Sequence, residues 1–439
     1  MSRNGTLLLL TTLWMGTAWG QTVVPTVQEA LALARRNNPE LINARQNRLV
    51  QEQQRVASRA ALRPQARLYS NLDYNYALPV QLIPLSLFGG GSDEYRSVRF
   101  GLPFVLLATG EITAPLVNRA ARADLALAEQ NLRIIDDQTL VLQDEISTQT
   151  ARVYHAALLT RAAIALTRRN LLAADTLVQI ARARLDKGQI EPLEYNRIRQ
   201  VQLTTADVLS QNQLSYGRNL AQLKLLLGLA PTDSLLLTDD LLKASQAPGP
   251  LPDATSLDRP QLSMRRAQLD LARRQIGREQ LAFWPTLAAY GRYSQQAQRD
   301  QFNFLNVSQR WFEIGVVGVQ FNLPLYTGGL RQGNLARARL LVQLAESQLA
   351  YEQHRQQTDT DDIRQAYDQA LRSLELNRQN DELSRQNVQI ALVKYRSGLF
   401  AYDQYLNVFN ETLTAQNRYL NALSTLFINQ TLWQIRFGQ

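Results

Sequence analysis

The sequence predicts a mainly α-helical protein with a small transmembrane β-barrel, and the whole arrangement is duplicated within the chain. Three observations support this fold class. The chain repeats itself at a nearly constant spacing, it contains short stretches in which apolar and polar residues alternate, and it has two helical stretches of 78 and 70 residues. Ordinary globular helices are much shorter, with a mean of about 11 residues. The protein is therefore not expected to be a conventional globular domain.

The composition excludes several classes of function. The chain has 439 residues, no cysteine and two histidines, so disulfides, thiolate metal sites and cysteine nucleophiles are ruled out. Its net charge of +9 is spread evenly along the sequence, and only 19% of the residues are charged. We therefore expect no nucleic-acid binding. No catalytic triad, paired-acid site or metal-ligand cluster stands out, so we predict no catalytic, cofactor-binding or metal-binding residues and no enzymatic activity.

The first 20 residues have the features of a secretory signal peptide. Arg3 precedes an apolar run from Leu7 to Met15, and Ala18-Trp19-Gly20 provides a small-x-small exit. The alternative is a short membrane anchor, although the run is shorter than the roughly 20 residues that a helix needs to span a bilayer. No later stretch approaches 18 uninterrupted apolar residues. A mature chain that crosses a membrane would therefore have to use β-strands.

Matching residues recur in the same order in the two halves of the chain. The offset is 221 residues for Pro39/Pro260, Pro64/Pro285 and Pro103/Pro324, and for Val98/Val319 and Phe100/Phe321. Farther on it becomes 210 residues, for Gly188/Gly398, Tyr195/Tyr405 and Asn219/Asn429. We infer a first structural repeat over 21–245, a proline-rich linker over 246–258 and a second repeat over 259–439.

Alternating polarity predicts four strands, at about 65–77, 95–104, 286–297 and 311–323. In the first, Leu68 and Leu72 share one face, and polar residues share the other. The polar residues predicted to line a water-filled barrel are Arg67, Asn71, Asp73 and Arg99. Transmembrane barrels need at least about eight strands. Two copies would supply eight and leave no room inside, whereas three would supply twelve and enclose a lumen.

The two long helical stretches run from Gly110 to Gly188 and from Gly328 to Gly398, each on the order of 100 Å at a rise of about 1.5 Å per residue. Leu125, Leu132 and Ile146 recur in steps of seven or multiples of seven, which is the spacing of a coiled coil. The opposite faces are rich in Gln, Asn, Ser and Thr. Such faces fit either a wet tunnel or a plain solvated exterior.

Three motifs in this order resemble TolC-like outer-membrane efflux proteins. They are Thr26–Ala34 followed by Asn37–Leu41, then Leu323–Gly329, then Tyr395–Gly398 with Tyr405-Leu406. The resemblance covers essentially the whole mature chain. It implies a homotrimer with a twelve-stranded β-barrel in the outer membrane of a Gram-negative bacterium, in contact with outer-membrane lipid, and a twelve-helix α-barrel across the periplasm.

The same resemblance implies the exit duct of a tripartite efflux or type I secretion system. The expected partners are a periplasmic adaptor (membrane fusion protein) and an inner-membrane pump of the RND, ABC or a similar class. Two helical hairpins would turn at Leu185–Gly188 and Tyr395–Gly398. The residues assigned to the tips and to adaptor contact are Lys187, Gly188, Glu191, Glu194, Ser397 and Gly398.

The periplasmic aperture is where the sequence departs from the family pattern. Many members narrow it with carboxylates six and nine residues after the second tip glycine, and these positions here are Gln404 and Asn407. Amides attract cations more weakly than carboxylates, so Asp403 is the remaining acidic candidate. Lys394 and Arg396 could pair with Asp403, or with Glu191 and Glu194 of the other hairpin, to hold the entrance closed.

A second reading of the sequence is a periplasmic coiled-coil adaptor or scaffold without a membrane barrel. This reading predicts a protein that is soluble without detergent. Aromatic residues in and beside the predicted strands argue against it, because Trp and Tyr concentrate at membrane interfaces. They are Trp284, Tyr290, Tyr293, Trp311 and Phe312.

Overall fold

The computed structural model describes residues 21–84, 95–242, 259–304, 306 and 308–437. The chain divides into two compact units. The hairpin unit comprises residues up to Gln46, Asp137–Leu262 and Glu352–Gln439, and the sheet unit comprises Asn47–Asp136 and Ser263–Tyr351. The predicted signal peptide (1–20) and linker (246–258) lie outside the described residues.

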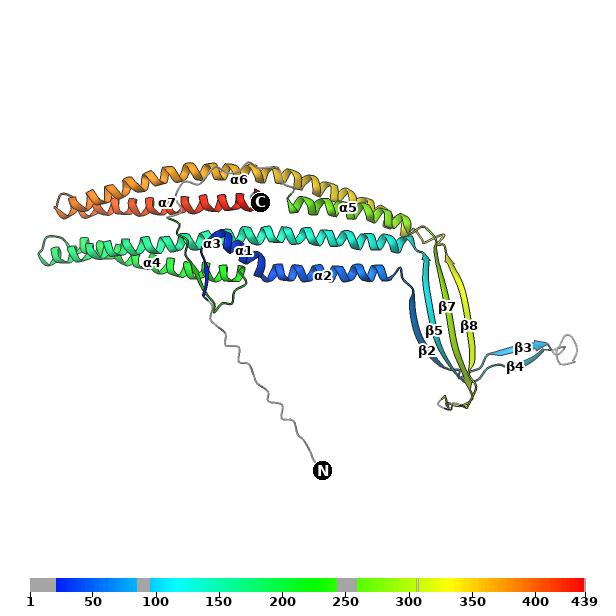
Figure 1. The fold of residues 1–439 in the computed structure, drawn as a ribbon. Coiled ribbons are helices and arrows are strands. Elements are labelled where there is room, and N and C mark those ends of the chain that lie inside the picture. The colour runs from blue at the N-terminus through cyan, green and yellow to red at the C-terminus, as the bar shows by residue number, and fades with distance from the viewer. Residues whose placement is uncertain (1–20, 85–94, 243–258, 305, 307, 438–439) are drawn as a thin grey trace, which may run out of the picture. The chain divides into compact units, whose positions relative to one another are not determined.

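The sheet unit is built on an antiparallel sheet of four strands in the order β2-β5-β7-β8 (Figure 1). Their bounds are Gln65–Tyr74, Phe104–Val117, Thr286–Arg299 and Phe312–Asn322. Three of them lie close to predicted strands. The two edges of the sheet, β2 and β8, are 10 and 11 residues long.

The prediction of a barrel strand over 95–104 is wrong. Residues Tyr95–Arg99 form β4, which pairs with β3 (Val80–Pro84) in a separate two-stranded hairpin. Arg99 pairs with Val80 in this hairpin, so it is not on the four-stranded sheet and does not join the predicted polar face. Gly101, with a φ of 104°, and the following proline at 103 separate β4 from β5.

The sheet strand of the first half is instead β5, so the first long helix does not begin near Gly110. Gly110 pairs with Leu68 and Tyr293 in the middle of the sheet, and α3 begins at Arg119. The 221-residue offset had matched β4 to β8, as in Val98/Val319, although the two are not structurally equivalent. The extra residues of the β3–β4 hairpin account for the smaller offset farther along the chain.

The described chain also contains six longer helices and one short helix. The short helix, α1 (Val27–Asn37), starts at Thr26, whose hydroxyl accepts a hydrogen bond from the Glu29 N–H. The others are α2 (Pro39–Ala60), α3 (Arg119–Asp186), α4 (Pro192–Leu226), α5 (Pro260–Leu281), α6 (Leu330–Arg396) and α7 (Tyr402–Phe437).

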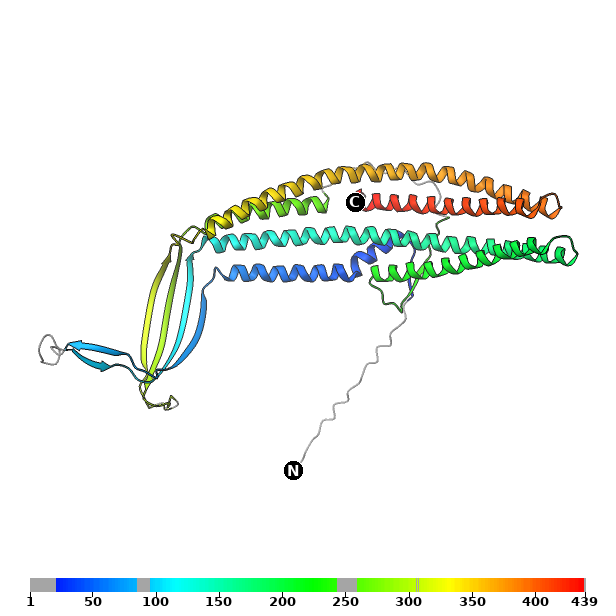
Figure 2. The same ribbon diagram turned by 180° about the vertical axis from the view of Figure 1, so that it is seen from behind.

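Within the hairpin unit, α3 with α4 and α6 with α7 form antiparallel hairpins, as both views show (Figures 1 and 2). Their shared core includes Tyr154, Leu158, Leu223 and Leu423. Strand β1 (Gln21–Val24) pairs in parallel with β6 (Ser234–Leu237) beside this core. In the sheet unit, ion pairs link neighbouring helices, for example Arg278 of α5 to Asp124 of α3 at 2.9 Å.

No helix in the described ranges is both long enough and apolar enough to cross a membrane.

Candidate functional site

Both helical hairpins reverse direction at a glycine with a positive φ angle. Gly188 has a φ of 67° and Gly398 a φ of 77°, a left-handed conformation in which a side chain is disfavoured. The N–H of Gln189 donates to the Arg184 carbonyl at 2.9 Å, and the N–H of Leu399 donates to the Lys394 carbonyl at 2.9 Å. These bonds satisfy carbonyl groups at the helix ends. The two tips are therefore tight, matching turns at the glycines singled out in the sequence.

A cluster of aromatic residues fills the space between the two tips. Tyr395 stacks on Tyr405 with 5.7 Å between ring centroids, and Tyr405 stacks on Phe409 at 6.0 Å. Ile198 of α4 and several α3 residues complete the same buried cluster. Burial raises the pKa of the Tyr405 phenol to about 12. The rings thus remain neutral and join the hairpins by apolar contact.

Arg184, near the end of α3, bridges the two hairpins. Its guanidinium donates to the backbone carbonyls of Tyr395 at 3.2 Å and Arg396 at 3.0 Å. It also lies over the Tyr395 ring, 4.8 Å from the centroid. Charged donors make stronger hydrogen bonds than neutral ones. The sequence analysis missed this residue, because one arginine in the last turn of a helix resembles an ordinary charge at a helix C-terminus.

The predicted aperture residues are exposed on the start of α7 and around its turn. Asp403 and Asn407 are exposed, and the Gln404 side chain accepts a hydrogen bond from the Ala401 N–H at 3.1 Å. Gln404 therefore caps the first turn of α7. At the other tip, Lys187, Gly188 and Glu191 are exposed.

The expected ion pairs of Lys394 and Arg396 are not formed. Across the described chain, neither residue pairs with Asp403, Glu191 or Glu194. Lys394 instead lies over the Phe400 ring at 4.9 Å, and its carbonyl accepts a hydrogen bond from the Ser397 hydroxyl at 3.1 Å. Arg184 supplies the hydrogen bonds between the hairpins at this place instead.

Glu194 is the acidic residue most affected by the meeting of the tips. Partial burial raises the pKa of its carboxyl group, nearby Asp403 and Glu191 raise it further, and Arg184 opposes the shift. Asp403 belongs to the other hairpin, so the carboxyl groups of Glu194 and Asp403 bring acidic groups of both hairpins near each other. Ionisation of Glu194 therefore works against the packing of the two tips.

This shift predicts a pH dependence. Because the folded pKa is raised, the ionisation penalty is absent below the ordinary value of 4.5 and grows as the pH rises through the folded pKa. The variant Glu194→Gln should therefore melt at a higher temperature than the wild type at neutral pH, and the difference should disappear near pH 4. Thermal unfolding of both proteins across this range measures the effect.

Glu411→Gln is the matched control, since Glu411 is an exposed residue of α7 with no ion pair in the described part of the chain. Its melting temperature should follow that of the wild type at every pH. If the difference in melting temperature between Glu194→Gln and the wild type is the same at pH 4 and pH 7, the expected penalty for ionising Glu194 is contradicted.

A second candidate surface is the polar face of the four-stranded sheet. The register places Arg67 opposite Glu111 and Glu111 opposite Arg292. Arg67 and Arg292 approach the Glu111 carboxylate at 2.8 and 3.8 Å. Two residues farther along each strand, on the same face, buried Thr109 and Ser294 share a hydrogen bond of 2.9 Å. Glu111 was not predicted from the sequence, because its segment was assigned to the start of a long helix.

The same register shows which other residues share this face. Asn71 and Asp73 lie on it as expected, opposite Leu107 and Val105 of β5. The face is not polar throughout, because edge strand β8 adds apolar side chains to it. These are Phe312, Ile314 and Val316.

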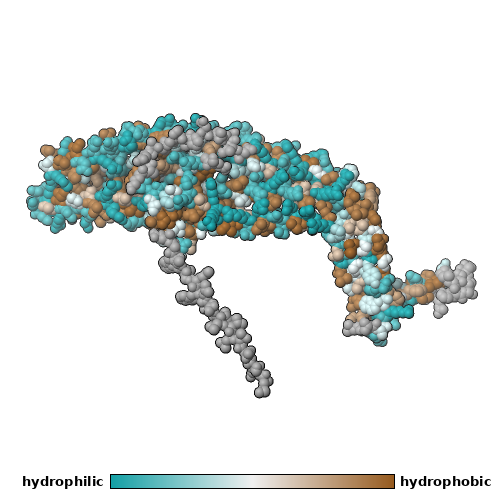
Figure 3. Space-filling view, viewed as in Figure 1, coloured by the Kyte–Doolittle hydropathy of each residue, from teal (hydrophilic) through white to brown (hydrophobic). Residues whose placement is uncertain are grey.

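The opposite face of the sheet is predominantly apolar and exposed. Val317 is 91% exposed and Leu68 is 83% exposed. Other exposed apolar residues on it are Leu72, Tyr74, Ile112, Tyr293, Val319 and Phe321. Figure 3 shows hydrophobic side chains gathered over the strands of the sheet unit. Exposed apolar surfaces of this extent mark sites of contact with other molecules or with lipid.

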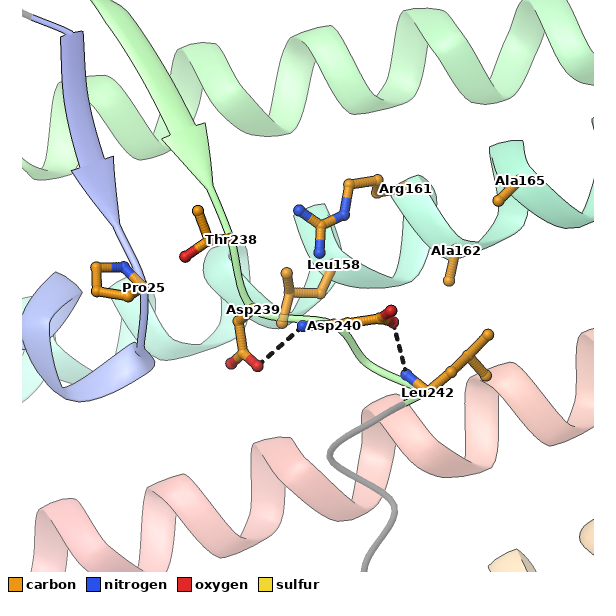
Figure 4. A pocket seen from close by; sticks show the side chains of 9 residues that line it. All are labelled: Pro25, Leu158, Arg161, Ala162, Ala165, Thr238, Asp239, Asp240 and Leu242. Carbon is orange, nitrogen blue, oxygen red and sulfur yellow. Dashed lines mark hydrogen bonds between the residues drawn. The ribbon is translucent and has the colours of Figure 1, made fainter.

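A pocket in the hairpin unit lies beside β6 and α3 (Figure 4). Its acidic groups hold the chain that follows β6: Asp239 accepts the Asp240 N–H at 2.9 Å, and Asp240 accepts the Leu242 N–H at 3.0 Å. The Tyr154 hydroxyl donates to Asp239 at 3.3 Å, and Arg161 donates to the Leu237 carbonyl. These bonds give the pocket a structural role in anchoring β6. Among the described residues, no group of three or more potential ligands is placed to hold a metal ion.

Comparisons with known proteins give a consistent result. Residues 251–431 match the outer membrane efflux protein family. No curated protein sequence matches the chain significantly. Similar solved structures include the outer membrane protein VceC of Vibrio cholerae, with 18% identity and a TM-score of 0.73 over 94% of this chain and 96% of that one.

Two further structures have the same fold. The MtrE outer membrane channel of Neisseria gonorrhoeae, in an open state, has 17% identity and a TM-score of 0.74 over 94% of this chain and 89% of that one. The CmeC outer membrane channel of Campylobacter jejuni has 15% identity and a TM-score of 0.72 over 94% of this chain and 85% of that one.

Proposed function

We propose that this chain, whose fold is that of solved outer-membrane channels and whose residues 251–431 match the outer membrane efflux protein family, forms the outer-membrane exit duct of a tripartite efflux or type I secretion system. The observation that carries the proposal is the two-faced, four-stranded sheet joined to two long helical hairpins. In this role the chain is a passive conduit and not an enzyme.

The edges of the sheet support assembly into a closed barrel. Strands β2 and β8 each have one neighbour in the described chain and so leave a long edge open. An exposed edge of this length invites pairing with another chain. If β8 of one copy pairs with β2 of the next, three copies make a twelve-stranded barrel with a lumen. We propose a homotrimer on this basis.

The two faces of the sheet fit opposite environments. The apolar face that carries Leu68 and Val317 would contact outer-membrane lipid, and the face that carries Arg67, Asn71, Asp73, Glu111 and Arg292 would line the lumen. Charged side chains on a lipid-facing surface are destabilising, whereas polar residues are typical of the interior of channel barrels. The Arg67–Glu111–Arg292 group carries one excess positive charge, which Asp73 on the same face offsets.

We propose that the hairpin tips form the periplasmic entrance. Three copies would bring three Asp403 carboxylates, flanked by Gln404 and Asn407, to one ring. The contacts of Arg184 and of the aromatic cluster would hold this ring narrow. The exposed turns around Gly188 and Gly398 would meet a periplasmic adaptor (membrane fusion protein), which couples the duct to an inner-membrane pump of the RND, ABC or a similar class.

The test is ion conduction by the assembled protein. The detergent-purified chain should form a heat-resistant trimer and conduct ions in planar bilayers. The double variant V316P/V317P should form no trimer. Proline has no backbone N–H, and neighbouring residues of a strand point their N–H groups to opposite sides, so one of the two prolines removes an N–H from the open edge of β8. The matched variant V316A/V317A keeps these N–H groups and should still assemble.

Two outcomes would count against the duct. One is a trimer that inserts into bilayers and shows no conductance. The other is a stable monomer that needs no detergent, which would favour the periplasmic adaptor or scaffold.

A further inference from the structure

Charge is distributed unevenly around the four-stranded sheet, although it is even along the sequence. Four segments span the junctions between the sheet strands and the adjoining ends of α2, α3, α5 and α6, at 53–64, 118–123, 280–285 and 323–345. Together they contain eight arginines and no Asp, Glu or Lys. At the other end of the sheet, the described residues of 75–103 and 300–311 contain three arginines and one acidic residue, Asp300. The basic excess is therefore larger at the helix end.

Four of these arginines stand nearest the strands, and we call them the arginine collar: Arg63, Arg119, Arg122 and Arg331. Arg63 precedes β2 by two residues, Arg119 is the first residue of α3, and Arg331 is the second residue of α6. Within the described ranges none of the four forms an ion pair. Arg63, Arg119 and Arg122 are exposed to solvent. Their charges are thus available to another molecule.

The collar lies against aromatic and apolar side chains. Arg119 stacks over the Trp284 ring at 3.9 Å, and Arg331 lies 5.4 Å from the centroid of the adjoining Phe283 ring. Arg331 also has a buried Nη1 without a hydrogen-bond partner. In the segment that precedes α6, Leu325 is 89% exposed and Tyr326 is 86% exposed. Aromatic rings beside arginines are typical of segments at the boundary between lipid tails and headgroups.

We propose that the arginine collar binds the headgroups of anionic phospholipids in the membrane leaflet next to the helices. This proposal rests on the proposed function, because it requires the apolar face of the sheet to lie in lipid. Guanidinium groups match the geometry of phosphate oxygens, and the exposed apolar residues would contact the adjacent acyl chains. Charge complementarity selects an anionic lipid over a zwitterionic one.

The experiment measures which lipid the protein retains. The detergent-purified trimer is incubated with equal amounts of phosphatidylglycerol and phosphatidylcholine, and the bound lipids are counted by native mass spectrometry. The wild type should retain phosphatidylglycerol preferentially. Each collar arginine should contribute about fivefold to the preference, so R119Q/R331Q and R63Q/R122Q should each reduce it about 25-fold.

The control variant is R168Q/R169Q, which removes the same charge from exposed positions of α3 in the hairpin unit and should leave the preference unchanged. R63Q/R122Q leaves both arginine–ring contacts intact. It therefore tests whether the collar binds anionic lipid even if R119Q/R331Q fails to fold. Inorganic phosphate added at the same concentration as the lipid should not displace it if the ligand is a membrane headgroup.

Equal retention of the two lipids by the wild type, or an unchanged preference in R63Q/R122Q, would contradict the proposed binding of anionic lipid by the collar. Bilayer conductance is recorded on the same preparations. Normal conductance without lipid preference would contradict lipid binding by the collar and would still support the exit duct. A wild-type trimer that inserts without conducting is evidence against the duct itself.

Discussion

Replacing Gly228 with alanine should destabilise the hairpin unit by at least about 3 kcal/mol in free energy of unfolding. Gly228 has a φ of 66°, and an added Cβ would lie 2.2 Å from the Asn37 carbonyl oxygen and 2.8 Å from its carbon. Neither backbone can move freely, because Asn38 donates from its amide to the Leu226 carbonyl at 2.9 Å. The steric conflict therefore adds to the strain of a left-handed conformation.

Thermal and urea unfolding of the detergent-solubilised protein measure this loss, and the heat-resistant trimer should disappear on gels. Gly217→Ala provides the matched control. Gly217 lies within α4, and no atom stands within 4 Å of its added Cβ. Alanine there should stabilise the protein by up to about 1 kcal/mol. If the Gly228→Ala variant is as stable as the wild type, the backbone at the α1–α2 junction moves to accommodate the added Cβ, and the expected steric conflict does not occur.

Replacing Arg184 with glutamine should open the proposed periplasmic entrance. The change removes two hydrogen bonds from a charged donor to the Tyr395 and Arg396 carbonyls, together with the contact over the Tyr395 ring. A loss of about 3 kcal/mol from the closed tips is expected from these bonds. It corresponds to a shift of roughly 100-fold in the ratio of closed to open tips. Conductance of reconstituted trimers in planar bilayers should rise accordingly.

Arg182→Gln is the control for this effect. Arg182 pairs with Asp186 at 3.2 Å and lies 5.8 Å from the Tyr195 ring, so its contacts stay within its own hairpin. Its loss should leave conductance unchanged, because exposed pairs of this kind contribute roughly 0–1 kcal/mol. Equal conductance of Arg184→Gln and wild-type trimers would show that Arg184 does not hold the tips together.

The strand errors have a physical origin in the sequence. Residues 95–99 alternate as a strand should, and they do form one, but alternation cannot reveal which partner a strand will choose. Residues 104–117 include Gly110 and Pro115, which weaken a strand pattern, and they adjoin a long helical stretch. Only pairing with β2 and β7 on both sides stabilises this segment as a central strand.

Parts of the site could be found from local signals, and other parts could not. The tip glycines were found because a tight reversal requires a positive φ, and Arg67 was found from the period of two. Arg184 and Glu111 were missed, because their roles depend on groups more than 40 residues away in the chain. The arginine collar could not be recognised for the same reason: Arg63, Arg331 and the pair Arg119 and Arg122 are far apart in sequence and come to the same end of the sheet only in the fold.

The sequence by itself determined the mainly helical fold, the internal duplication, the two tip turns and the two-faced character of the strands. These depend on residue periodicity and on the conformational freedom of glycine, which act over a few neighbouring residues. The tertiary structure decided which strand enters the sheet, which arginine joins the hairpins and where unpaired charge collects. Those outcomes depend on contacts between distant segments, because a side chain's partners are set by the folded backbone.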